Sequence, residues 1–436
     1  MSGGQWETQN KVRPGAYINF ETNDLVATGL DSRGTVVVPI TVDWGETKKF
    51  IKVSPNTKFT ELFGKPLGEL KPIQEAFKGT GNVIVYNLNG EGEKSKAIIN
   101  SFTAIAVHGG SDGNKITVIV TKSLNGGATI KTYYDGSQVD SQVVEKATEL
   151  TANGFVTFTG ELPASDATLK LTGGKTIAAT NESYSDLASG LDSQIFKTIA
   201  IGTDDDSIKL LFTLKVKQWR ENEGKNVHFI TNNYNAADHE GVVSVLNGIY
   251  DGAELISAKE AVYWLGGAYA NAITNSLTYA QYPGATDCER LSHDEIVKAL
   301  KEGHIVFTYN EGADGIDRVV VEQDINTFRS FTPRKNQDFR KGKIVRQMDI
   351  VSNNVQHIYS RFFIGKVDNN ENGRNLFKGQ IMKVVLDPLV KSGAIDPYDP
   401  NEIIIAQGAE KDAVAVDMGL KFVDAMEKLY MTVKCK

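Results

Sequence analysis

The chain has 436 residues, 41% of them hydrophobic and 23% charged, which is typical of an ordinary soluble globular protein of about three domains. Its net charge of −7 argues against a protein built to neutralise nucleic-acid phosphates. No apolar run approaches the roughly 20 residues that span a bilayer. The first residues contain no secretory signal, and two cysteines exclude a disulfide framework, so we expect synthesis in a reducing cytoplasm.

The N-terminal third predicts the start of an α/β domain. Residues 16–20 (AYINF) follow a Pro-Gly turn signal and predict a short strand. Residues 35–42 (TVVVPITV) form a β-branched apolar run, as expected of a strand buried on both faces. Two short helices are expected near residues 58–63 and 72–78, before a second buried strand at 82–88 (NVIVYNL).

A different pattern follows, and then the first one returns. Short alternating runs such as ITVIVTK and ATLKLTGG recur between residues 98 and 177 at intervals of about eight to twelve residues, which predicts a β-sandwich or barrel. Helices are then expected at 207–222, 258–271 and 296–301, the last preceded by a capping box at Ser292 and Glu295. The interpretation is one α/β domain, residues 26–97 and 183–331, with an all-β domain inserted at 98–182.

The last hundred residues predict an α+β module, residues 332–427. Six apolar residues recur at helical spacing and define one buried stripe, namely Ile344, Met348, Val351, Val355, Ile358 and Phe362. A second apolar stripe at 375–390 contains an Asp-Pro pair that is expected to break or kink the helix. Alternating apolar residues at 414–422 predict a strand.

The chain ends with LYMTVKCK, residues 429–436, in which apolar and polar residues alternate as in a strand with one buried face. Consecutive strands usually pair, which favours a local hairpin with residues 414–422. The link VDAMEK has no Gly, Pro or Asn for a tight turn, which weakens that hairpin. The partner of this segment is therefore left open by the residues alone.

Three short motifs fail when their context is considered. GGSDG at 109–113 matches a nucleophile elbow around Ser111 but precedes a strand and not a helix, so a hairpin loop is favoured. GKT at 174–176 lacks the first glycine of a phosphate-binding loop, since position 169 is Leu169. The calcium-loop pattern at 368–373 has Gly379 where the bidentate glutamate is required. We predict no catalytic, cofactor-binding or metal site.

One cluster of positive charge stands out in an acidic chain. It contains Arg334, Lys335, Arg340, Lys341, Lys343 and Arg346, with Asp338 as the single acidic residue among them. A solvated loop and helix start is the commoner explanation for such a run. The functional alternative is a surface for an acidic partner.

Several long stretches resemble one family over essentially the whole chain. They are VRPGAYINF, SLTYAQYPGATDCERLSHDEI, VVVEQDINTFRSFTP with QDFRKGKIVRQMDIV, FFIGKVDNNENGRNLFKGQI and VDAMEKLYMTVKC. Together they resemble the subunit of a contractile phage tail sheath, of the short type found in phages and defective prophages of Gram-positive hosts. The resemblance implies a multidomain α+β fold, in which an α/β domain with an inserted all-β domain precedes a C-terminal assembly domain with strand-exchanging terminal arms.

The resemblance also implies a function without enzymatic activity or cofactor. Rings of six subunits would stack around an inner tail tube and contract to drive it through the target cell envelope. The partners implied are neighbouring sheath subunits, the tube protein, and baseplate and tail terminator proteins, without direct nucleic-acid contact or membrane insertion. The location implied is a virion or a phage-tail-like particle made in the host bacterial cytoplasm.

Two arms would connect neighbouring subunits, at residues 1–25 and 428–436. Their donated strands would be Ala16, Tyr17, Ile18, Asn19 and Phe20 at one end, and Leu429, Tyr430, Met431, Thr432, Val433, Lys434 and Cys435 at the other. The basic cluster would face the acidic tube. The competing functions are a non-contractile β-rich surface or adhesion protein and an esterase-like hydrolase around Ser111.

Overall fold

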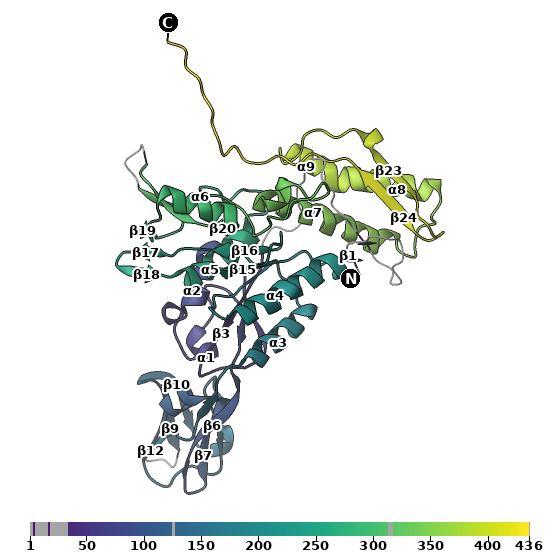
Figure 1. The fold of residues 1–436 in the computed structure, drawn as a ribbon. Coiled ribbons are helices and arrows are strands. Elements are labelled where there is room, and N and C mark those ends of the chain that lie inside the picture. The colour runs from purple at the N-terminus through teal and green to yellow at the C-terminus, as the bar shows by residue number, and fades with distance from the viewer. Residues whose placement is uncertain (1–2, 5–15, 18–33, 124–126, 313–316, 436) are drawn as a thin grey trace. The chain divides into compact units, whose positions relative to one another are not determined.

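The computed structural model describes residues 3–4, 16–17, 34–123, 127–312 and 317–435 (Figure 1). It has a mixed α+β, multidomain fold, as predicted, and it divides into two compact units. Unit 1 comprises Met1–Val37, Glu75–Asn82 and Ile195–Lys436, and unit 2 comprises Val38–Gln74 and Val83–Gln194.

Unit 2 contains a small α/β part. Strand β5 (Val83–Asn87) is buried along its whole length and pairs antiparallel with β4 (Phe50–Val53), as its apolar sequence predicts. The helical elements of this part are α1 (Phe59–Phe63), η1 (Leu67–Glu69), α3 (Asn181–Gly190) and η4 (Leu191–Ser193). Lys48 lies 2.5 Å from Asp186 and so links the loop before β4 to α3.

The rest of unit 2 is a sandwich of two four-stranded antiparallel sheets, ordered β10-β9-β8-β12 and β11-β7-β6-β13. The strands are β6 (Gly90–Ile99), β7 (Phe102–Gly109), β8 (Ile116–Lys122), β9 (Ala128–Tyr134), β10 (Ser137–Val144), β11 (Val156–Thr159), β12 (Ala167–Lys170) and β13 (Lys175–Ile177). Between β7 and β8 lies η2 (Ser111–Lys115), and η3 (Ala147–Glu149) follows β10. Both sheets contribute to one core, which includes Phe102, Val118 and Val156.

The sandwich begins at Gly90, before the predicted boundary at residue 98. The first residues of β6 are GEGEKSKA, and most of their side chains are exposed. Their composition is that of a loop, because this stretch presents charged side chains to solvent and buries only Ser95. The apolar period that identifies strands is absent there.

Unit 1 is organised around a parallel sheet ordered β20-β16-β15-β14-β3. Its strands are β14 (Thr198–Ala200), β15 (His228–Asn232), β16 (Val242–Val245), β20 (His304–Ile305) and the first two residues of β3 (Val36–Ile40). Helices α4 (Asp206–Gln218) and α5 (Ala258–Asn271) pack on it, and η5 (Trp219–Glu223) extends α4. Gly266 allows α5 to approach closely, since a Cβ there would lie 2.7 Å from that of Ala200.

The remaining elements of the central region include α6 (His293–Glu302), which has the predicted capping box between Ser292 and Glu295 and ends at the left-handed Gly303. Helix α2 (Lys71–Gly79) contributes its last turn to unit 1. The short strands are β17 (Ile249–Asp251), β18 (Glu254–Ile256), β19 (Asp287–Cys288), β21 (Phe307–Asn310) and β22 (Arg318–Val321). The N-terminal pair β1 (Gly3–Gly4) and β2 (Ala16–Tyr17) is parallel.

The C-terminal part of unit 1 is helical and then β. Its elements are η6 (Gln337–Arg340), α7 (Gly342–Ile358), η7 (Tyr359–Phe363), α8 (Glu371–Gln380), η8 (Ile381–Leu386), α9 (Asp387–Lys391), η9 (Pro400–Glu402), β23 (Ile403–Gln407) and β24 (Val414–Met418). Pro388 occupies the first turn of α9 directly after the π-helical η8, so the predicted break is a local change of helix geometry.

The predicted stripe on α7 is confirmed for its first five residues but is wrong for Phe362, which is 54% exposed. The amide of Ile364 bonds to the carbonyl of Tyr359, five residues back, so the helix end is π-helical. This wider turn rotates the following side chains and buries Phe363 in place of Phe362. An α-helical period cannot anticipate that rotation.

Candidate assembly site

The C-terminal segment after Glu427 runs as a coil (Figure 1), and it exposes large apolar side chains. Leu429 and Tyr430 are 86% and 89% exposed, and Met431 and Val433 are 75% and 70% exposed. Residues 429–435 form neither helix nor strand in the structure. Adjacent apolar side chains at this exposure are characteristic of a segment that is buried against a partner.

The local hairpin is not formed. Strand β24 pairs antiparallel with β23, from Val414↔Gln407 to Met418↔Ile403, and Phe422 bridges to Ile395. Residues 414–422 therefore pair with segments that precede them in the chain. Within the described residues, the β23–β24 sheet has two strands, so each strand has one open edge.

The β23–β24 hairpin is a suitable acceptor for a further strand. A two-stranded sheet is marginal by itself and needs additional strands or packing. Here one face packs on the helical core around Val385 and Leu389, through side chains such as Val416. The other face exposes Ile404, at 57%, so an added strand would gain main-chain hydrogen bonds and apolar contacts there.

A polar network holds the chain just before the exposed segment. The Glu427 carboxylate accepts hydrogen bonds from Thr278, Gln323 and Lys341, and Lys341 also lies 2.9 Å from Asp424. Burial disfavours the Glu427 carboxylate, but these three hydrogen bonds together hold its pKa below the ordinary value. The segment from 428 onward is thus attached to the subunit at a defined point.

The N-terminal arm is described only in part. Ala16 and Tyr17 form β2 and pair with Gly3 and Gly4 of the same chain, while Ile18, Asn19 and Phe20 lie outside the described residues. Strand β1 lies against η5 and β2 against α7. Donation of residues 16–20 to a neighbour stays a prediction.

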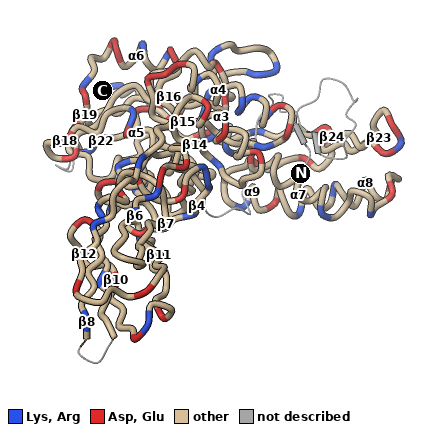
Figure 2. The backbone as a smooth tube through the Cα atoms, turned by 90° about the horizontal axis from the view of Figure 1, so that it is seen from below, with Lys and Arg blue, Asp and Glu red and all other residues tan. Residues whose placement is uncertain are grey.

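The basic cluster is not one exposed patch. Arg346 is 5% exposed and binds Asp324 at 2.7 Å, so its assignment to a surface is wrong. Lys335 lies 2.7 Å from the buried Glu240, and Lys341 belongs to the Glu427 network. Figure 2 shows Lys and Arg interspersed with Asp and Glu along unit 1. These positive charges are neighbours in the sequence. In the folded chain, however, Lys335, Lys341 and Arg346 each pair with an acidic residue from another segment.

The other members of the cluster are Arg334, Arg340 and Lys343. Arg334 is exposed, and the other two are half-buried. Burial lowers the pKa of Arg340, as does the nearby Arg329, and burial lowers that of Lys343. A half-buried cation beside another cation favours an anionic partner. A role of these three residues against an acidic surface remains a prediction.

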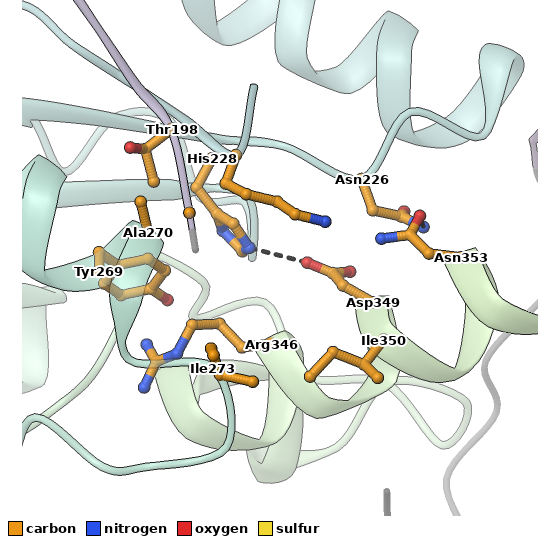
Figure 3. A pocket seen from close by; sticks show the side chains of 12 residues that line it. Thr198, Asn226, His228, Tyr269, Ala270, Ile273, Arg346, Asp349, Ile350 and Asn353 are labelled. Atoms are coloured by element: carbon orange, nitrogen blue, oxygen red, sulfur yellow. Dashed lines mark hydrogen bonds and ion pairs between the residues drawn. The ribbon is translucent and has the colours of Figure 1, made fainter. Parts of the chain in front are cut away.

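Helix α7 carries a second buried charge cluster (Figure 3). Asp349 accepts a bidentate pair of hydrogen bonds from Arg220, at 2.7 and 2.9 Å, and lies 2.7 Å from Nε2 of His228. Burial disfavours the Asp349 carboxylate, but Arg220 and His228 hold its pKa below the ordinary value. Burial also lowers the pKa of His228. The cluster joins α7 to β15 and η5.

His228 and Asp349 line a cavity of about 50 Å³ together with Arg346 and Tyr269 (Figure 3). His228 Nδ1, the Tyr269 hydroxyl and Arg346 Nε have no hydrogen-bond partner among the described residues. A cavity of this size has room for a few water molecules, which would satisfy such atoms. The cavity is thus part of the buried ion-pair cluster of α7.

The other candidate motifs have structural roles. Ser111 starts a short 3-10 turn, and its amide bonds to the hydroxyl of Thr176. Asn370 caps α8 by accepting from Gly373 N, which explains the calcium-loop pattern. Over the described ranges, no group of His, Cys, Asp and Glu could hold a metal ion. In the same ranges, no helix has the length and hydropathy needed to cross a bilayer.

Sequence reasoning missed the Glu427 network and the Asp349 cluster. Both combine residues that are about 100 or more positions apart, such as Glu427 with Gln323 and Asp349 with Arg220. A local pattern carries no signal for such pairs. Asp349 lies on the polar side of α7, next to Arg346 and Ser352 in helical spacing, so the apolar stripe gave no sign that it is buried.

Three models of one family match the chain in order. The N-terminal region of domain III of tail sheath protein Gp18 matches residues 33–88, the phage tail sheath central domain 178–327, and the phage tail sheath C-terminal domain 334–436. Most of the sandwich lies between the first two matches. The matched domains define the class, a structural protein of a phage tail or tail-like particle.

Individual relatives are similar to this chain over all or nearly all of its length. Phage-like element PBSX protein XkdK of Bacillus subtilis (strain 168) is 35% identical, with 100% of both chains covered. The crystal structure of a sheath tail protein from Desulfitobacterium hafniense has a TM-score of 0.82 at 33% identity, covering 97% of this chain and 100% of that one. For a sheath tail protein from Listeria innocua the TM-score is 0.78 at 30% identity, covering 93% and 96%. The chain therefore belongs to the phage tail sheath protein family.

Proposed function

We propose that the chain is the force-generating subunit of a contractile tail sheath. It polymerises as stacked rings of six around an inner tail tube and contracts to drive that tube through the target envelope. It acts without catalysis or cofactor. The extended sheath stores the energy for contraction. Baseplate and tail terminator proteins lie at its two ends. The family membership and the exposed C-terminal segment support this function.

The observation that carries the proposal is an unpaired strand sequence beside an incomplete sheet. Leu429, Met431 and Val433 alternate with polar residues and are 70–86% exposed, while the β23–β24 sheet has open edges. Burying each such side chain contributes about 1.5–3 kcal/mol, and strand addition also supplies main-chain hydrogen bonds. A neighbouring copy of the chain offers both, so residues 429–435 are the donated strand, as residues 16–20 are at the other end.

Strand donation fits a lattice that must change shape without separating. Contraction alters most contacts between subunits, whereas a strand paired with a neighbour's sheet stays bonded while the bodies rotate about the arm. Contacts made through charge can break and re-form during the same movement, because exposed ion pairs contribute little. Arg334 and Arg340 are the candidates for such contacts with an acidic tube.

Electron microscopy of the purified protein, alone and with its tube protein, tests the proposal. We expect tubes or stacked rings for the full chain. The matched variant lacks residues 428–436, and we expect it to remain a folded, soluble monomer that builds no sheath. Truncated protein that unfolds would contradict strand donation, and a full chain that forms no rings or tubes under any condition would contradict the sheath function.

The tube contact is tested separately, by co-sedimentation with tubes of the double variant Arg334→Glu and Arg340→Glu. We expect weakened binding at low salt, and the difference from wild type should shrink as added salt screens the charges. The control is Lys298→Glu and Lys301→Glu on α6, which reverses the same amount of charge elsewhere. Equal binding by both double variants would remove the basic residues from the interface.

A further inference from the structure

The attachment of the C-terminal segment to its own subunit is abrupt. The Glu427 side chain is 9% exposed, whereas Met426 and Leu429 on either side are 104% and 86% exposed. The Glu427 side chain thus points into the subunit between exposed residues. A buried carboxylate is stable only when it is fully paired.

The contacts of Glu427 come from three separate segments. The Thr278 hydroxyl donates to Oε1 at 2.8 Å, and Gln323 Nε2 donates to Oε2 at 2.6 Å. Lys341 Nζ binds the same Oε2 at 2.5 Å and lies 2.9 Å from Asp424. The carboxylate is therefore held from both sides, which fixes its position and direction.

The groups that hold Glu427 are themselves rigidly placed. The Thr278 hydroxyl accepts from the amide of Asp324 at 2.9 Å, and the Asp324 carboxylate binds the buried Arg346 of α7. Gln323 is next to Asp324, and Lys341 immediately precedes α7. The network therefore connects the root of the C-terminal segment to the buried ion pair of α7.

We infer that Glu427 is a positioning residue for strand donation, which fixes the point and direction at which the C-terminal strand leaves one subunit for a second copy of the chain. This inference rests on the proposed sheath function. The segment after Glu427, residues 428–435, has eight residues. Fully extended, they reach about 27 Å at 3.3–3.6 Å per residue, so the acceptor β23–β24 sheet of the neighbour lies within about that distance of Glu427.

Loss of this anchor has a defined consequence. The preceding fixed point is Phe422, which bridges to Ile395 and packs against Phe328, Phe339, Ile344 and Met348. Val423 also packs against the helical core, and Asp424 pairs with Lys341. Without the Glu427 contacts, residues 425–427 would become mobile in the free subunit, the hold on the residues before them would weaken, and the freed residues would have to be ordered at each donation. That entropy opposes assembly although the donated strand itself is unchanged.

The experiment uses the full chain with Glu427→Ala and Lys341→Met, which remove the contact from opposite sides, and with Lys341→Arg, which retains charge and donors. Limited trypsin digestion of the free subunit, followed by mass measurement, reports on the anchor, because Lys421 and Lys428 flank it. Sedimentation reports the critical concentration for sheath assembly. Two variants on different segments keep the test valid if one misfolds.

We expect wild type and Lys341→Arg to be cut first after Lys428, and Glu427→Ala and Lys341→Met to be cut after Lys421 as well. The critical concentration of the last two should rise at least about tenfold, since several freed residues must be ordered. Unchanged cleavage would overturn the anchor, and normal assembly despite cleavage after Lys421 would overturn the positioning role. If wild type does not assemble, the proposed function fails, while the digestion still decides the anchor.

Discussion

Proteins usually bury apolar residues and expose charged ones. Helix α7 and the C-terminal segment each break one half of this rule. The helix buries charge, with Asp349 and Arg346 at 6% and 5% exposure, whereas the segment exposes Leu429 and Met431 at 86% and 75%. The buried charges are paired within unit 1, so their environment is complete in a single chain. The apolar side chains of the C-terminal segment stay exposed to solvent in the described part of the single chain. The first region therefore stabilises the fold, and the proposed role of the second is assembly.

The largest effect on the free energy of unfolding is expected for Asp349→Ala. The substitution leaves Arg220 buried without its counter-ion, which costs about 3–5 kcal/mol. Denaturant titration measures the loss. The control is Asp204→Ala, which removes the exposed partner of Lys259 and should change stability by about 0–1 kcal/mol. Similar small losses of stability in both variants would contradict a stabilising role for the buried ion pair of α7.

The next effect distinguishes the two adjacent phenylalanines at the end of α7. Phe363→Ala should destabilise by about 3 kcal/mol, because it empties a site in a packed core. Phe362→Ala should change stability by less than about 0.5 kcal/mol, since that side chain is exposed. Thermal or denaturant unfolding measures both. The reverse order would mean that the α-helical period continues and that η7 is not π-helical.

A smaller effect depends on pH. Burial lowers the pKa of His228 in the folded state below its ordinary value of 6.5, so the unfolded chain takes up a proton first on acidification. Stability should therefore fall as pH decreases below about 6.5, with at most about 1.4 kcal/mol per pH unit from this group. His228→Gln can still donate to Asp349 but does not titrate. An equally steep decline in that variant would assign the pH dependence to other residues.

The sequence predicts elements whose causes are local. The buried strands β3 and β5, the capping box of α6 and the stripe from Ile344 to Ile358 follow from propensity and periodicity within a few residues. The π-turn that exposes Phe362 has no local signature. The pairing of Arg346 with Asp324 likewise depends on the folded chain, so a cluster of positive charge in the sequence does not survive as a surface.

The candidate assembly site also has one part that the sequence predicts and one part that it does not. Alternation at residues 429–435 predicts a strand with one buried face, and the exposure of those residues agrees with a partner outside the described chain. The network around Glu427 could not be predicted, because Thr278, Gln323 and Lys341 lie 86 to 149 positions away. Contacts between residues so far apart in the sequence leave no local pattern, whereas the alternation of a strand can be recognised within seven residues.

Cross-linking through Cys435 tests the central claim, that the C-terminal strand pairs with another copy. Cys435 is exposed, whereas Cys288 is buried and burial raises its pKa to about 11, so Cys435 is the reactive native thiol. A second cysteine is introduced at Ile404 or at Asp417, which are paired and exposed on β23 and β24. The assembled protein is treated with a short bis-maleimide, with Cys435→Ser as the control. We predict a ladder of covalent multimers, and a cross-link confined to single chains would contradict strand donation.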